Sequence, residues 1–264
     1  MPSFLFPVFC RLIGHLVKND DTLANFANDG DDIRADTHAL ECVRIAMNPT
    51  LSSNTPEKSD LERPLHPLLP QLLARSAARH HHLCPRQVLG VRLGLGGLIA
   101  LGLLTADTTT PFCNNDKRLL TIVETDGCGA DGIAVATDSF VGRRTLRVED
   151  YGKVAATLID THTGQAVRVA PTAVSRTLAQ VYAPNQPSRW HEYLIGYQRI
   201  PDAQLVAIQP IALRRPLAKI LSEPGRRTIC QLCEEEVMNE REVVDENGRI
   251  LCQACAGHSY YIPR

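Results

Sequence analysis

The sequence predicts an α+β protein, with helices against a mixed or antiparallel sheet in a core domain and a small four-cysteine zinc finger at the C-terminus. Helical and strand-like segments interleave through residues 64–213 without a regular βαβ repeat, which disfavours a doubly wound sheet. Apolar residues make up 44% of the 264 residues and charged residues 22%, as in globular proteins. Two Cys-x-x-Cys pairs follow the core segment.

Residues 1–63 differ in composition from the rest of the chain. Between residues 18 and 62 there are ten acidic residues against four basic ones, and residues 48–60 are polar and rich in turn formers. We therefore expect residues 1–63 to be a poorly ordered N-terminal extension and linker. Met47 is an alternative start of a shorter chain.

The core domain, residues 64–213, is expected to open with two helices. Apolar residues recur at helical spacing over residues 64–79. Residues 84–104 form an apolar helix in which Pro85 suits the first turn. The following elements are expected to be a strand at 118–125, a helix at 129–139, a hairpin at 153–171, helices at 171–182 and 188–200, and a strand at 203–213.

Neither apolar stretch of the sequence predicts a membrane segment. Residues 4–17 contain Arg11 and His15 and follow no basic region, and the apolar run at 93–104 is shorter than the roughly 20 residues that a span requires. We expect no contact with a membrane. The nine cysteines include two Cys-x-x-Cys pairs, which indicates metal binding in a reducing compartment and places the protein in the cytoplasm.

We expect residues 228–264 to form the zinc finger and residues 214–227 to be a basic linker before it. The two pairs are Cys230 with Cys233 and Cys252 with Cys255, separated by eighteen residues that include an Asn-Gly turn. This spacing is typical of structural zinc, which takes four thiolates in a tetrahedron, with a hairpin between the pairs. A redox-active pair of dithiols is the alternative.

A second candidate metal site lies in the core and is expected to be formed by His82, Cys84 and Cys128, with His80 as an alternative or outer ligand. Cys84 stands at a predicted helix start and Cys128 follows a predicted strand. Histidine and two cysteines would leave one coordination position open, as in catalytic or exchangeable sites, for a second zinc or another transition metal. The alternative is a surface histidine run beside buried, unreactive cysteines.

Several motifs in this order resemble the FmdE family, which takes its name from a component of formylmethanofuran dehydrogenase. They are HxHLCP at 80–85, GxRxG at 90–94, VETDGCGADGI at 123–133, DYGKVAAT at 150–157 and TGQAVRV at 163–169. The resemblance covers roughly residues 64–184, and the C-terminal pairs resemble the treble-clef-type finger that many members carry. It implies an α+β core, a homodimer, and a metal near the histidine–cysteine motif.

Lys153 and Arg168 match two further segments of the family pattern, and we expect these basic side chains to hold an anion or substrate. Ion pairs with Asp150 or Glu149 are the alternative, and no catalytic residue is assigned. One segment departs from the family pattern. Ser139 replaces a cysteine and Arg143 replaces a lysine, so that a third core thiolate is missing.

Three functions remain open on the sequence. The first is a metal-binding protein accessory to subunits of a molybdenum or tungsten one-carbon oxidoreductase. The second is a stand-alone metalloenzyme, with Glu124 or Asp126 as the proton carrier. The third is a zinc-finger protein that binds protein or nucleic acid, although a net charge of −1 and 5% aromatic residues disfavour nucleic acid.

Overall fold

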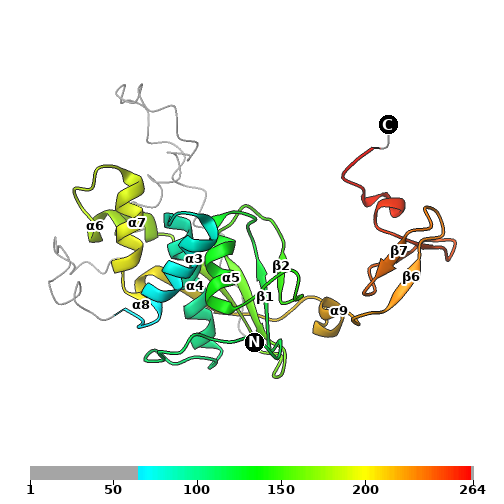
Figure 1. The fold of residues 1–264 in the computed structure, drawn as a ribbon, viewed down its shortest axis with the longest axis horizontal. Helices are drawn as coiled ribbons and strands as arrows, with labels where there is room; N and C mark the ends of the chain where they lie inside the picture. Colours follow the sequence, from blue (N-terminus) through cyan, green and yellow to red (C-terminus); the bar gives the residue numbers. More distant parts are fainter. Residues whose placement is uncertain (1–64, 263–264) are drawn as a thin grey trace, which may run out of the picture. The chain divides into compact units, whose positions relative to one another are not determined.

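The structure is a computed structural model that describes residues 65–262 (Figure 1). The predicted extension and linker at 1–63 lies outside the described residues. A five-stranded sheet with strand order β2-β1-β3-β4-β5 forms the centre of the core, and two two-stranded sheets, β6-β7 and β8-β9, follow it in the chain. This confirms the predicted α+β class.

The helices of the described part are α3 Leu69–His80, α4 Pro85–Ala100, α5 Cys128–Thr137, α6 Ser175–Tyr182, α7 Arg189–Arg199, α8 Asp202–Leu205, α9 Leu217–Leu221 and the π-helix η1 Ala254–His258. The strands are β1 Leu119–Val123, β2 Leu146–Val148, β3 Ala156–Asp160, β4 Ala166–Pro171, β5 Val206–Pro210, β6 Arg227–Ile229, β7 Glu236–Met238, β8 Val243–Val244 and β9 Ile250–Leu251.

The five-stranded sheet is mixed, as the sequence predicts. Strand β1 pairs with β2 in parallel and with β3 antiparallel, and the β3–β4 and β4–β5 pairs are antiparallel. The β3–β4 hairpin turns through residues 161–165, within the segment expected to form it. Strand β2 was not predicted, because three residues after a turn are too short for an alternating pattern to stand out.

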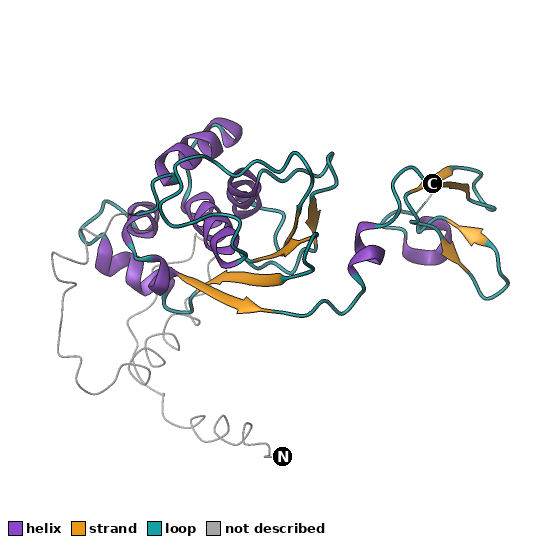
Figure 2. Ribbon diagram, turned by 90° about the horizontal axis from the view of Figure 1, so that it is seen from below, coloured by secondary structure: helices purple, strands orange, loops and turns teal. Residues whose placement is uncertain are grey.

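Helices α4 and α5 cover one face of the sheet (Figure 2). Helix α4 is buried almost all round, and its side chains join those of β1, β3 and β4 in the main apolar cluster. It ends at Ala100, earlier than expected, because Gly102 takes a left-handed φ of 67° and the N–H of Leu103 bonds back to Leu98 O. No helix in residues 65–262 is long and apolar enough to cross a membrane.

The second face of the sheet carries a smaller apolar cluster of Leu120, Ile159 and Ala166. Side chains from residues 211–221, which include α9, pack against it. The segment expected to be only a basic linker therefore contains a short helix whose apolar side chains contribute to the core.

Candidate metal centres

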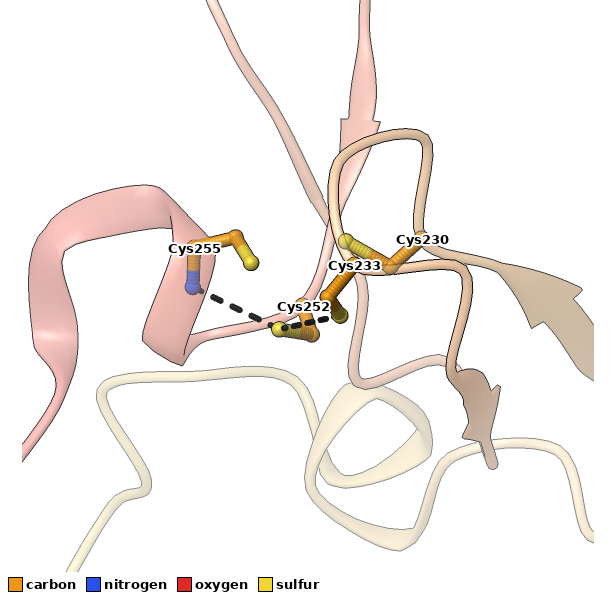
Figure 3. Close-up of side chains that lie close together, drawn as sticks. All are labelled: Cys230, Cys233, Cys252 and Cys255. Carbon is orange, nitrogen blue, oxygen red and sulfur yellow. Dashed lines mark hydrogen bonds between the residues drawn. The ribbon is translucent and has the colours of Figure 1, made fainter. Parts of the chain in front are cut away.

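The four cysteines of the C-terminal module, residues 228–264, converge on one point (Figure 3). Cys230 and Cys233 lie in the turn between β6 and β7, whereas Cys252 follows β9 and Cys255 lies in η1. Their four sulfur atoms lie within 4.8 Å of one another, and no other set of three or more such ligands in the described residues does so. The arrangement matches the predicted four-cysteine site.

Backbone N–H groups and neighbouring thiols shift the pKa values of this cluster in opposite directions. The backbone N–H groups of Cys233 and Cys252 lower the pKa of Cys230 to about 6. The neighbouring Cys252 side chain and burial raise the pKa of Cys255 to about 12. Four thiolates so close together repel one another, so that full deprotonation needs a bound metal ion to offset the charge.

In the core, two helices start side by side. Helices α4 and α5 run parallel, because residues 87–91 of α4 contact 129–133 of α5 and Gly94 contacts Ala136 one turn later. Gly90 makes this approach feasible: a Cβ there would lie 2.2 Å from Gly129 O. The N-terminal ends of both helices, where unpaired N–H groups favour negative charge, therefore lie together.

Each of these helix starts carries a cysteine. Cys84 is the N-cap of α4, is 7% exposed, and its backbone N–H donates to Gln87 Oε1 at 2.8 Å. Cys128 is the first residue of α5. Burial raises the pKa of the Cys84 thiol, backbone N–H donation by Gln87 lowers it, and the adjacent Cys128 side chain raises it. The thiols of Cys84 and Cys128 therefore lie close enough to affect each other.

His80, the last residue of α3, completes this group. Its Nε2 lies 3.2 Å from Cys128 Sγ, and its Nδ1 lies 3.0 Å from Asp131 Oδ2. The exposed ring of His82 lies beside it, with the two ring centroids 4.9 Å apart. The structure therefore places His80, rather than His82, against Cys128. Asp131 was missed from the sequence.

The predicted anion residues lie elsewhere in the core. Arg168 of β4 donates from Nε and Nη2 to the two carboxylate oxygens of Glu124, at 2.6 and 2.7 Å. Glu124 raises the pKa of Arg168, and its own side chain is 9% exposed. Lys153 is exposed in the loop before β3. The Glu124 carboxylate is therefore engaged by Arg168 in a two-point ion pair.

Ser139 and Arg143, the two residues that depart from the family pattern, both have polar partners nearby. Ser139 is fully buried, lies 3.1 Å from the Thr121 hydroxyl, and donates to Thr137 O. Arg143 pairs with Asp138 at 3.6 Å and donates to Asn114 O. Each replacement therefore has a structural role in the loop between α5 and β2.

Comparisons with known proteins match the core to a family model. Residues 79–206 match the family described as "FmdE, Molybdenum formylmethanofuran dehydrogenase operon". A curated protein of Archaeoglobus fulgidus, "Probable S-adenosyl-L-methionine-binding protein", is 29% identical over 216 residues, 73% of this chain. The chain spans 54% of that relative's length.

Among solved structures, the chain is similar to a tungsten formylmethanofuran dehydrogenase FmdE-like protein from Syntrophus aciditrophicus. The TM-score is 0.48 and the sequence identity is 20%, over 74% of this chain and 95% of that one.

Proposed function

We propose that this protein, whose residues 79–206 match the FmdE family model, holds two metal ions of different function. A structural zinc ion would occupy the four cysteines of the C-terminal module. An exchangeable transition metal ion, zinc or a similar late metal, would occupy the core site and serve the protein's chemistry.

The observation that carries the proposal is the chain of contacts from Asp131 through His80 to Cys128, whose thiol interacts with that of Cys84. The ligand atoms of His80, Cys84 and Cys128 do not all lie within 4.8 Å of one another, so a bound metal ion would draw them closer together. Two soft thiolates and an imidazole suit zinc and its neighbours far better than magnesium. Three protein ligands leave one position open for water or a substrate. Such a metal would supply Lewis-acid chemistry there.

The protein's role, as we propose it, is accessory to a molybdenum or tungsten one-carbon oxidoreductase. The family's description names such an operon, which supports this assignment. The sequence holds no Cys-x2-Cys-x2-Cys run for iron–sulfur clusters, so we assign electron transfer to a partner chain. We further propose a homodimer in the cytoplasm, where a reducing environment would keep the metal-binding cysteines as thiols.

A stand-alone metalloenzyme has less support, because Arg168 engages Glu124 and only Asp126 of the two predicted proton carriers remains. The name of the archaeal relative suggests S-adenosyl-L-methionine as a ligand of this chain too. Calorimetric titration of the metal-loaded protein with that compound tests this second candidate. Saturable binding supports it, and the lack of any heat of binding removes it.

Metal analysis of the purified full chain tests the proposal. We expect two metal ions per chain in the unmodified protein and one in the Cys84→Ala variant. The Cys252→Ser variant should also hold one. During titration with a chelator, the core metal should leave first, because three protein ligands hold it and four hold the other.

The Cys113→Ala variant is the matched control, since Cys113 is an exposed cysteine outside both sites. It should keep both metal ions. A single metal ion in the unmodified protein, unchanged by Cys84→Ala and absent from Cys252→Ser, would leave the core without a metal function and favour the protein-interaction hypothesis.

A further inference from the structure

We propose that Asp131 is the positioning residue of the core site, and that its carboxylate holds His80 in the tautomer whose Nε2 lone pair faces Cys128. The inference rests on the core metal proposed above and deepens it. It adds a residue that lies outside the predicted ligand set.

Helix α5 presents two groups to the same imidazole ring. Cys128 and Asp131 are its first and fourth residues, and residues three apart share one face of a helix. Both lie in the first turn, where the helix dipole favours a negative side chain. One short segment therefore supplies a thiol and a carboxylate in fixed relation to each other.

Helix α3 brings the imidazole to them. His80 is its last residue, and His81 ends the helix in the left-handed conformation with φ of 64°. The His80 side chain is 27% exposed and that of Asp131 48%, so this pair lies at the rim of the site. The buried Cys84 thiol lies deeper.

The hydrogen bonds determine the tautomer. An ionised carboxylate only accepts, so the Nδ1 of His80, 3.0 Å from Asp131 Oδ2, must carry the proton. In the neutral ring Nε2 then bears a lone pair, 3.2 Å from Cys128 Sγ. Metal-binding histidines are commonly oriented in this way by a carboxylate on the second nitrogen.

Removing the negative charge of Asp131 should allow the His80 ring to adopt either tautomer. An asparagine at this position either accepts from Nδ1–H or donates to Nδ1, so that it permits both tautomers. Loss of such an orienting carboxylate typically weakens metal binding about 10- to 100-fold. A glutamate retains the acceptor, and the exposure of Asp131 leaves room for the longer side chain.

The test uses the full chain and has two readouts. In the metal-free protein, ¹⁵N NMR of the His80 ring, assigned with His80→Gln, should show a protonated Nδ1. The Asp131→Asn variant should show both tautomers. In a Co²⁺ titration, Asp131→Asn should raise the core Kd about 10- to 100-fold and leave the cysteine module unaffected, while Asp131→Glu restores most of the affinity.

Glu149→Gln is the matched control, because it removes one negative charge from an exposed position after β2. It should leave both readouts unchanged. An unaltered tautomer together with unaltered core affinity in Asp131→Asn would overturn the positioning role. If the tautomer responds but the unmodified core binds no Co²⁺, the positioning role stands and the metal site proposed above fails.

Discussion

The close approach of α4 and α5 is the feature on which the core site depends, and Gly132→Ala tests it. A Cβ at Gly132 would lie 2.3 Å from Gln87 O, which is roughly 1 Å inside normal contact distance. The clashing atom belongs to the backbone of α4 and cannot rotate away. The two helices must therefore separate.

The expected change in the free energy of unfolding of Gly132→Ala is the sum of two opposing effects. Overpacking of a core typically costs about 1–3 kcal/mol, and a backbone clash belongs at the upper end. Alanine in a helix interior stabilises the fold by about 0.5–1 kcal/mol relative to glycine. The net expectation is a loss of about 2 kcal/mol, or about 4–8 °C in the Tm of a domain this size.

Urea unfolding followed by tryptophan fluorescence is the assay. Trp190 is the chain's single tryptophan and lies in α7, so that it reports on the core and not on the cysteine module. Gly96→Ala in α4 is the control: a Cβ there meets only side-chain atoms of β5, Val206 first at 3.2 Å, and we expect a change of about 0.5 kcal/mol or less. A Gly132→Ala midpoint equal to or above that of the unmodified protein would refute the helix packing.

Three further predictions concern other parts of the chain. Cys252→Ser should unfold the cysteine module without changing the Trp190 transition, and a shift of that transition would show that the module supports the core. Arg118 lowers the pKa of the buried Asp160, so the pair stabilises the fold above about pH 4 and loses this contribution as pH falls through the folded-state pKa. Asp160→Asn should cost about 1–3 kcal/mol at pH 7 and reduce the acid sensitivity, as acid titrations of both proteins would show. Deleting residues 1–46 should leave the Tm nearly unchanged, and a drop of more than about 5 °C, or roughly 1–2 kcal/mol, would contradict the composition argument.

The sequence predicted those features that arise from local spacing. The paired cysteines, the β3–β4 hairpin and the Asn-Gly turn between β8 and β9 each depend on a few consecutive residues, and the structure contains all three. The fold class also followed, because the alternation of long elements is visible along the chain.

Features that depend on tertiary contacts could not be predicted. The Glu124–Arg168 pair joins residues 44 apart, which become neighbours only once β1, β3 and β4 are in register. The sequence gives no role to Asp131 within the helix expected at 129–139, because that role requires α3 to end beside α5. A carboxylate three residues after Cys128 was the one signal available, and many helices begin with an acidic residue.

X-ray absorption at the metal edge of the Cys252→Ser variant tests the central claim most directly, because the remaining metal then reports only on the core. We expect two sulfur ligands at about 2.3 Å and one imidazole nitrogen at about 2.0–2.1 Å, with the last position held by an oxygen. Loss of the remaining metal ion when Cys84→Ala is added to this variant would complete the assignment. A spectrum without sulfur ligands, or a Cys252→Ser variant that retains no metal, would contradict it.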